Sequence, residues 1–560
     1  MLTKTKFYRI FIEILLCQIA LIVVLGINKP SYFVDEIWTY NLANAYMFPA
    51  FANVDGYFYA WLKPDFWKTL VVVAQDKAFS YDSVWYNQSK DVLPPFFYAV
   101  VHTVSSFFPG KFSNWFVLGP NLLFFIGSQF VLLQIAKKIF QRTWFAIIIC
   151  LIYGFTLGGI NSVLYFRMYM MVSFFGLLAF YLHMQLCDKL AKGLEISKKI
   201  FICIALVDVL GFLTHYYYLV FISFVAIATM WWMNKKKLYS LVLQYFSFSI
   251  AALVVCIGIF PPCLKQIAGV GEYGYRGAQS LSNAFNSSFL KRLGDYNSLL
   301  AKDLGGDILL MLLLIIGLMV LNSLRKLFID FNISHEETGY KLDVDFHSAS
   351  RHYSFHFLDE DKFVGLCIIA SVPYYLTIAK ISVMSDDRYI FMVIPFIIIW
   401  GFYLLNRLVT AISGKKYLGA VLCVCVVWLA AITSFRTENI KFADMELPGA
   451  IALVEEKHKD TPMLVINSNA HWHPIIEHIF LLEKTPKAYL TTENEIEKVK
   501  DALSQVDYQG NELLAFVTWE CKKPLKDIQE ELKQETGFKH CKVVYEGGKY
   551  KRGHMYVLTK

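Results

Sequence analysis

FYRIFIEILLCQIALIVVLGI, residues 7–27, is followed closely by an acidic pair set among aromatics, FVDEIWTY at residues 33–40. An apolar run of about 20 residues can cross the hydrocarbon core of a bilayer as one helix. The run is too long for the core of a signal peptide, and no small-residue cleavage site precedes Asp35, so we expect a retained membrane helix. Asp35 and Glu36 then lie where this helix meets water. A carboxylate there costs much less than the roughly 2.5 to 3.5 kcal/mol at a helix centre, so solvated loop acids are the alternative interpretation.

The composition extends this interpretation to the whole chain. The 560 residues are 56% hydrophobic, 16% aromatic and only 18% charged, and the apolar residues come in long blocks. This pattern is typical of a polytopic membrane protein with a soluble portion. The formal net charge is +8, but the basic residues lie in short clusters between apolar blocks. Such clusters set membrane topology, so we expect membrane lipids as neighbours and no nucleic acid as a partner.

Eleven stretches are long and apolar enough to be membrane spans. They are residues 7–27, 115–136, 143–158, 162–186, 199–216, 217–233, 239–260, 305–322, 363–380, 389–408 and 417–434. The predicted fold is therefore mostly α, a polytopic bundle of about 11 spans, with interfacial helices in the first outer loop and a small C-terminal α/β domain. We expect residues 1–434 to form the membrane module and residues 435–560 to form the α/β domain.

The basic clusters predict the orientation. If the N-terminus is cytoplasmic, alternate connections should also be basic, as the positive-inside rule requires. They are, at Lys137, Lys138 and Arg142; Lys189, Lys192, Lys198 and Lys199; Lys235, Lys236 and Lys237; Arg325 and Lys326; and Lys415 and Lys416. The C-terminal domain is then extracytoplasmic, and we expect the plasma membrane of a bacterium.

The connections between spans differ in kind. The first outer connection, 28–114, is long and rich in aromatics, so we expect short helices on the membrane surface. Within it, LPPFFY at residues 93–98 begins an apolar run to Phe108. A span there would put Lys137 outside, so we expect a surface helix that begins at the two prolines. The outer connection 264–303 is either a lid over a site or a plain mobile loop.

The inner connection 327–362 carries His352 and His356. Their spacing suits one helical face and a metal, but the segment is polar and is more easily interpreted as a disordered insertion.

The C-terminal segment has a different pattern. Short strand-like runs alternate with helical patterns, which predicts an α/β layer. The strand-like runs are residues 462–467, 487–491 and 512–519, and the helical patterns are 474–483, 493–506 and 524–536. We expect a final hairpin formed by residues 542–545 and 554–558. In an oxidising compartment Cys521 could pair with Cys541. His471, His473 and His478 have loose ligand spacing, for which a structural role is the stronger interpretation than zinc.

Several polar residues fall on the predicted outer side. Arg167 and Tyr169 begin the fourth span, His215 marks the turn between the fifth and sixth, and Asp387 and Arg388 precede the tenth. Each arginine alone could anchor to lipid headgroups. Two arginines, a histidine and a carboxylate pair at one depth suit a site that binds phosphate beside a carboxylate base.

The order of these features resembles the GT-C superfamily of membrane glycosyltransferases, in particular the protein O-mannosyltransferase and aminoarabinose transferase group, over residues 7–408. The matching motifs are Asp35-Glu36, Pro94-Pro95-Phe96-Phe97-Tyr98, Arg167-Met168-Tyr169, and Arg388-Tyr389 with Pro395. Many relatives have His directly before the prolines, where this chain has Leu93. His215, His102 or Asp91 would then substitute for it, and a requirement for a divalent cation is left open.

The resemblance implies transfer of a sugar from a polyprenyl phosphate to an acceptor hydroxyl of a glycan, lipid or protein. Arg167, Arg388 and His215 would bind the donor phosphate. Asp35 would be the catalytic base and Glu36 would orient it, and a single in-line displacement would invert the anomeric centre. The predicted substrate-lining residues are Tyr40, Tyr98, Tyr169, Asp91 and Asp387.

Two other classes of function compete with a transferase. A transporter or flippase for lipid-linked sugars would place ionisable residues near the middle of the bilayer. Few lie there, and Asp208 is the main exception. A membrane scaffold for the C-terminal domain would leave Asp35 and Glu36 without a role.

Overall fold

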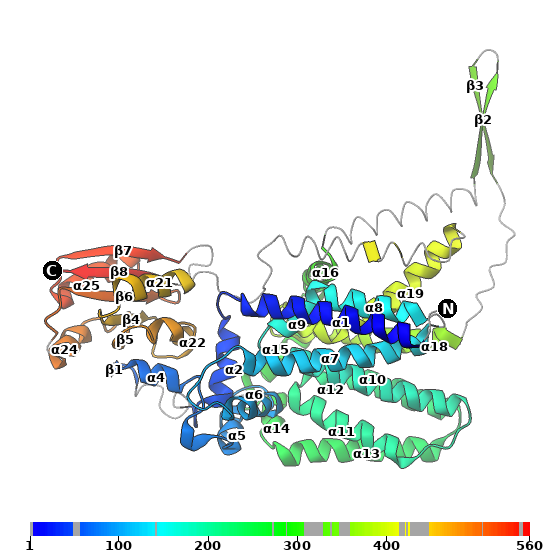
Figure 1. Ribbon diagram of the computed structural model, residues 1–560, viewed down its shortest axis with the longest axis horizontal. Helices are drawn as coiled ribbons and strands as arrows, with labels where there is room; N and C mark the ends of the chain where they lie inside the picture. The colour runs from blue at the N-terminus through cyan, green and yellow to red at the C-terminus, as the bar shows by residue number, and fades with distance from the viewer. Residues whose placement is uncertain are drawn as a thin grey trace. The chain divides into compact units, whose positions relative to one another are not determined.

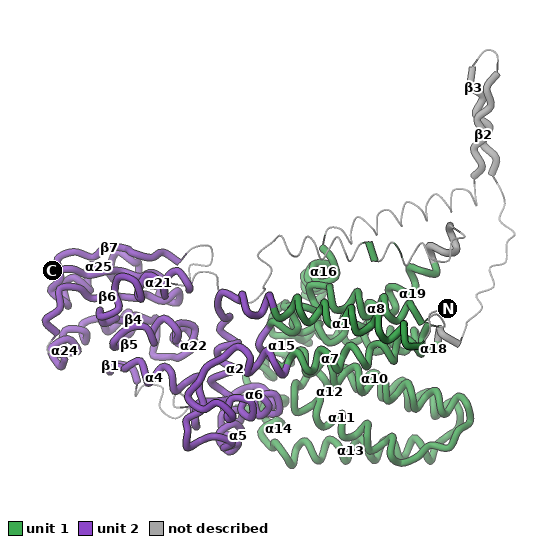
Figure 2. Tube along the Cα trace, in the orientation of Figure 1, with its two compact units in different colours: residues 1–23, 121–164, 168–439 green, residues 24–120, 165–167, 440–560 purple. Residues whose placement is uncertain are grey.

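The computed structural model describes residues 4–560 apart from 49–56, 141–142, 272–273, 287, 307–328, 337–338, 347–358, 414–420, 422–423, 426–446, 507 and 548–552. The chain divides into two compact units (Figure 2). Unit 1 comprises residues 1–23, 121–164 and 168–439, and unit 2 comprises 24–120, 165–167 and 440–560. The predicted boundary at residues 434 and 435 lies outside the described residues.

Long apolar helices dominate unit 1. Within the described residues, six helices are long and apolar enough to cross a membrane, and a bent pair makes a seventh candidate. The six are α1 (Lys4–Ile27), α7 (Trp115–Ile139), α10 (Tyr169–Ala191), α12 (Tyr217–Lys235), α13 (Tyr239–Ile259) and α18 (Asp359–Ile381). These helices make the chain an integral membrane protein. The count of eleven spans and the sidedness of the termini stay predictions.

The remaining helices of unit 1 are shorter. They are α8 (Thr143–Phe155), α9 (Leu157–Leu164), α11 (Lys198–Thr214), α14 (Cys263–Ala268), α15 (Tyr275–Asn286), α16 (Phe289–Leu304), η4 (Asp387–Tyr389), η5 (Phe391–Val393) and α19 (Ile394–Ser413). Helices α10, α11, α12 and α13 lie side by side (Figure 1). Only 17% of the apolar window of α13 is buried, as expected of a helix that faces lipid.

The fourth predicted span, 162–186, differs in its start. Helix α9 ends at Leu164 and α10 begins at Tyr169, so Arg167 lies in a non-helical segment between two helices. Helices α8 and α9 meet at an angle of 56°. Gly159 allows this bend, because a Cβ there would stand 2.0 Å from the carbonyl oxygen of Tyr153.

Two connections contain structure that the sequence analysis did not predict. Within 327–362, strands β2 (Ile329–Glu336) and β3 (Gly339–Phe346) form an antiparallel hairpin. The register pairs Ile329 with Phe346 and Phe331 with Val344, so the interpretation as a disordered insertion missed a hydrophobic period of two. His352 and His356 lie outside the described residues. The connection 264–303 contains α15 and α16, and Arg292 on α16 donates to the carbonyl oxygen of Ala379 at 2.8 Å.

Unit 2 combines the first connection with the C-terminal segment. Its first part contains α2 (Val34–Asn44), β1 (Trp61–Leu62), α4 (Pro64–Thr69), η2 (Gln75–Lys77), α5 (Tyr81–Ser89) and α6 (Phe96–Ser106). Helix α6 begins after the two prolines, as predicted, and its 11 residues are too few to cross a bilayer. Buried asparagines hold the end of α2. Asn41 donates to Leu70 O at 2.7 Å and Asn44 to Val71 O at 3.0 Å.

The C-terminal part of unit 2 is an α/β layer. Its helices are α21 (Leu447–Lys457), α22 (His473–Ile476), α23 (Ile479–Leu482), α24 (Lys498–Gln505) and α25 (Leu525–Thr536), and its strands are β4 (Met463–Asn467), β5 (Ala488–Thr492), β6 (Glu512–Thr518), β7 (His540–Glu546) and β8 (Gly553–Thr559). The sheet order is β1-β5-β4-β6-β8-β7, with β4 parallel to β5 and β6. Strand β1, from the first connection, is an edge strand on β5. Cys521 and Cys541 are separate thiols and form no disulfide.

Candidate functional site

The acidic pair lies in the first turn of α2, in unit 2. Glu36 is fully buried, and its Oε1 lies 3.0 Å from the ammonium nitrogen of Lys29, which is buried as well. The same carboxylate accepts from the backbone N–H of Phe33 at 2.9 Å and of Phe166 at 2.8 Å. Burial raises the pKa of Glu36, while the Lys29 ammonium opposes that change. Glu36 thus joins the segment before α2 to the segment that follows α9.

Asp35 is in a different environment from its neighbour. It is half-buried, and its Oδ2 accepts from the hydroxyl of Tyr165 at 2.9 Å. A half-buried carboxylate with one hydroxyl donor is oriented and can still be reached by a substrate, as a general base must be.

Arg167 is 5% exposed and bonds to the start of α2. Its Nη1 donates to the backbone oxygen of Asp35 at 3.0 Å and to Thr39 Oγ1 at 3.2 Å. Its guanidinium lies 5.7 Å from the ring centroid of Tyr98, within the range of a cation–π contact. The structure therefore brings Asp35, Arg167 and Tyr98 together.

The other residues predicted from this part of the chain differ in exposure. Tyr40 has no exposed surface, donates to Ser113 O at 3.0 Å and packs on Phe112 with ring centroids 4.6 Å apart. Asp91 is half-buried in the turn before the prolines. The roles of both residues in lining a substrate stay predictions.

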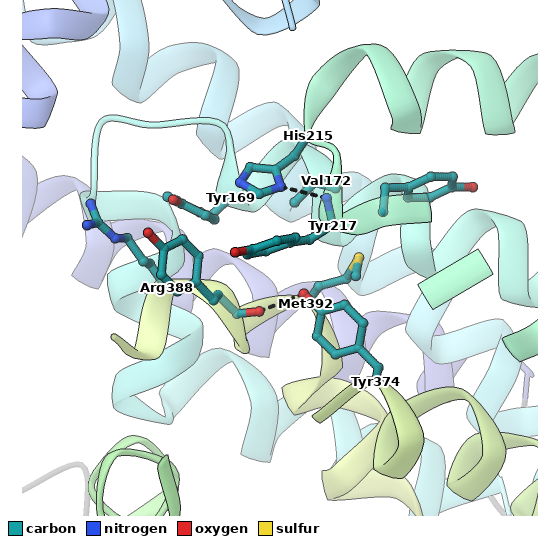
Figure 3. A pocket seen from close by; sticks show the side chains of 9 residues that line it. Tyr169, Val172, His215, Tyr217, Tyr374, Arg388 and Met392 are labelled. Atoms are coloured by element: carbon teal, nitrogen blue, oxygen red, sulfur yellow. Dashed lines mark hydrogen bonds between the residues drawn. The ribbon is translucent and has the colours of Figure 1, made fainter. Parts of the chain in front are cut away.

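A second set of predicted residues lies in unit 1, around one pocket (Figure 3). The lining residues are Tyr169, Val172, His215, Tyr217, Tyr218, Tyr374, Arg388, Tyr389 and Met392. They come from four parts of the chain: the start of α10, the start of α12, helix α18, and the turn before α19. The pocket has a volume of about 10 Å³, the space of about one water molecule. A larger group could enter only if these side chains moved apart.

Local structure orients Arg388. Asp386 precedes η4, and its carboxylate accepts from the Arg388 backbone N–H at 3.3 Å. The same carboxylate lies 3.3 Å from the guanidinium Nε. The Arg388 guanidinium is also 5.2 Å from the ring centroid of Tyr389. Asp387, predicted to line the substrate, is buried beside them.

His215 directly follows α11 and is 5% exposed. Its Nδ1 accepts from the backbone N–H of Tyr217 at 3.1 Å, so in the neutral ring the proton is on Nε2, which is a donor (Figure 3). The rings of His215 and Tyr169 are 5.5 Å apart. Arg388, this N–H and the tyrosine hydroxyls together suit an anion.

Some of the residues around the pocket could not be identified from the sequence. Asp386 was missed, although it directly precedes Asp387 and Arg388 in the sequence, and so were Tyr217 and Tyr374. The Tyr374 hydroxyl donates to Tyr389 O at 2.6 Å. Tyrosines at the ends of apolar segments resemble an interfacial aromatic belt, which hid this signal.

Metal binding was left open by the sequence. Among the residues that the structure describes, no three His, Cys, Asp or Glu side chains are grouped closely enough to hold a metal ion. His471 instead pairs with Glu520, and the ring of buried His478 lies 4.6 Å from that of Phe516.

Comparison with known proteins gives a distant likeness. No protein-family model matches the sequence, and no curated protein matches it. The chain is similar to two crystal structures of ArnT from Cupriavidus metallidurans. The structure bound to undecaprenyl phosphate has 10% sequence identity, covers 97% of this chain and 97% of that chain, and gives a TM-score of 0.47. The apo structure has 10% sequence identity, covers 96% of this chain and 97% of that chain, and gives a TM-score of 0.41.

Proposed function

We propose that the chain is a GT-C-like glycosyltransferase of the bacterial plasma membrane. It moves a sugar from a polyprenyl phosphate to an acceptor hydroxyl on the extracytoplasmic face, with inversion. The observation that carries the proposal is the convergence of Arg388, the N–H donor of His215 and several tyrosines on one pocket of unit 1. A cation and neutral donors beside a membrane span suit a phosphate that is attached to a lipid.

In the proposed reaction the acceptor oxygen attacks the anomeric carbon while the bond from that carbon to the phosphate oxygen breaks. The phosphate leaves with the electron pair as polyprenyl phosphate. Arg388 and His215 stabilise its developing charge, because fixed donors are most effective where charge develops. The pocket opens for this group as its side chains move apart.

The acceptor proton goes to Asp35. The Tyr165 hydroxyl orients this carboxylate through the 2.9 Å hydrogen bond, and Arg167 bonds the backbone oxygen of the same residue at 3.0 Å. Binding of the donor phosphate by Arg167 stays a prediction. Glu36 acts indirectly, since its bonds to Lys29, Phe33 N and Phe166 N fix the start of α2 and the segment that carries Arg167.

The test measures release of polyprenyl phosphate from a panel of polyprenyl-phosphate sugars, with a membrane extract as the source of acceptor. We expect Asp35→Asn to lower turnover by about 10²- to 10⁴-fold, the usual contribution of a general base. The matched control is Asp76→Asn, because Asp76 is an exposed acid of the same unit, with 73% of its side chain exposed. No turnover of any donor by the wild type would favour a transporter. Equal turnover by Asp35→Asn would mean that another group is the base.

A further inference from the structure

The α/β layer of unit 2 has a topological switch point between β4 and β6. The chain runs from β4 to β5 on one side of β4 and returns to β6 on the other side. Helix α25 packs on the sheet face that carries Ala515 and Val517, whereas His478, just before α23, lies against Phe516. Successive residues of a strand point to opposite faces of the sheet, so Phe516 faces the side opposite to Ala515 and Val517. The connection after β4 therefore leaves toward one face of the sheet and the connection after β6 toward the other. In open α/β sheets, ligands bind outside the carboxyl ends of the strands at such a point.

Buried side chains hold the two connections at this edge. Asn467 ends β4 and has no exposed surface. Its amide donates to the carbonyl oxygens of Asn469 at 2.9 Å and His471 at 3.2 Å, and its Oδ1 accepts from the Thr518 hydroxyl at the end of β6 at 2.6 Å.

The end of β5 contributes a third contact. Buried Glu493 accepts from the backbone N–H of Lys522 at 2.7 Å and of Lys523 at 2.9 Å. The connections after all three parallel strands are therefore fixed in advance, which lowers the entropy that a ligand must overcome.

The connections present a tryptophan and a histidine–carboxylate pair. Trp519 follows β6 and is 42% exposed, yet its indole N–H donates to buried Glu477 at 3.0 Å, so the ring is held in place. Next to it in the chain, Glu520 Oε2 lies 2.5 Å from Nε2 of His471 and 3.4 Å from the Ser468 hydroxyl. His471 and Glu520 belong to the two connections that diverge at the switch point. Both keep part of their side chains exposed, 40% for His471 and 20% for Glu520.

This combination suits a sugar better than an anion. A pyranose ring offers an apolar face to an aromatic side chain and hydroxyls to carboxylate, imidazole and hydroxyl groups, as in sites that combine an apolar surface with a few placed polar groups. A phosphate would meet Glu520 and Glu493 at this edge. The connection after β4, Ser468-Asn-Ala-His-Trp472, also lacks the glycines that let a backbone approach a phosphate.

We propose that the connections 468–472 and 519–523 form a binding site for a neutral oligosaccharide, with Trp519 stacking on a sugar ring and Glu520 and His471 bonding its hydroxyls. The site involves none of the residues proposed for sugar transfer. It therefore holds or fails independently of that function.

The test uses the full chain in lipid nanodiscs, because glycoside detergents would compete for the site. The probes are end-labelled cellohexaose, maltohexaose, mannohexaose and chitohexaose, with oligogalacturonate as the anionic probe. We expect at least one neutral probe to bind, and Trp519→Ala to weaken its affinity about tenfold, as for loss of an aromatic stack and its contact area. Trp519→Phe loses the same bond to Glu477 but keeps a ring, so it should retain most of the affinity. Glu520→Gln should weaken binding as well.

Phe79→Ala is the matched control for Trp519→Ala, since Phe79 is a 44% exposed aromatic of the same unit, and it should leave binding unchanged. Failure of every neutral probe to bind the wild type would overturn the proposal. Equal affinity in Trp519→Ala and wild type, or binding of oligogalacturonate alone, would overturn it too.

Discussion

Lys29→Met should strongly destabilise the start of α2. The substitution leaves the Glu36 carboxylate buried without its counter-charge, since both side chains of the pair are fully buried and lie 3.0 Å apart. Breaking such a pair from one side costs about 3 to 5 kcal/mol. Every ~1.4 kcal/mol changes an equilibrium constant by a factor of ten, here the constant for opening of α2. The cost therefore corresponds to roughly 10²- to 10⁴-fold faster hydrogen exchange of the α2 amides.

A double-mutant cycle separates the pair from general damage. Glu36→Gln alone leaves a buried ammonium, but Lys29→Met with Glu36→Gln leaves no charge and keeps an acceptor for one of the two backbone donors. The double variant should therefore exchange more slowly than the sum of the single effects predicts, by about 1 kcal/mol or more. Additive effects would refute the idea that Lys29 and Glu36 stabilise unit 2 as a pair.

The pH dependence of the Lys29→Met variant gives a second check. Burial already raises the pKa of Glu36, and Lys29 opposes that rise, so removing Lys29 raises the pKa further. A carboxyl whose folded pKa is raised contributes stability that is complete below its unfolded pKa and is lost as the pH rises through the folded value. The loss of stability in Lys29→Met relative to the wild type should thus be smaller at pH 5 than at pH 8. The two proteins are compared at the same pH by hydrogen exchange. A deficit that is constant between these pH values would contradict the assignment.

Two further predictions concern buried polar groups of unit 2. Burial lowers the pKa of His102. The neutral ring therefore contributes stability above the ordinary histidine pKa of about 6.5, and this stability is lost as the pH falls. Between pH 7.5 and 5.5, the melting temperature of the wild type should fall more than that of His102→Gln. Asn467→Ala should cost about 1 to 3 kcal/mol by removing a partner of buried polar groups, seen as faster exchange at the ends of β4 and β6, whereas Asn469→Ala, at an exposed position, should change exchange little.

The sequence predicted the element types well where the hydrophobic pattern was long or regular. The apolar blocks gave α1, α7, α10, α12, α13 and α18, and short strand-like runs gave β4, β5 and β6. It failed where a short interruption decided the structure. Tyr165-Phe166-Arg167-Met168 lies inside an apolar run, and nothing in its periodicity indicates that the chain leaves the helix there.

Contacts between distant segments were also beyond the sequence. Strand β1 has two residues, and its place on the sheet follows from its pairing with β5, together with the hydrogen bond from the Trp61 indole to Ala502 O at 2.9 Å. Propensity scales describe neighbours along the chain, and tertiary contacts of this kind override them. The candidate residues could be chosen from motifs, but their partners, such as Lys29 for Glu36 and Asp386 for Arg388, came from the structure.

The two acids of the motif illustrate how helix geometry separates residues that the sequence presents as a pair. Adjacent residues of an α-helix point about 100° apart, so Asp35 and Glu36 need not both face the interior. Glu36 does, and its oxygens bond to Lys29 and two backbone donors. Asp35 stays half-buried beside the Tyr165 hydroxyl. The Glu36 side chain has no exposed surface, so an acceptor hydroxyl cannot reach its carboxylate. This division of roles, more than the motif itself, makes Asp35 the candidate base and Glu36 the residue that holds α2 in position.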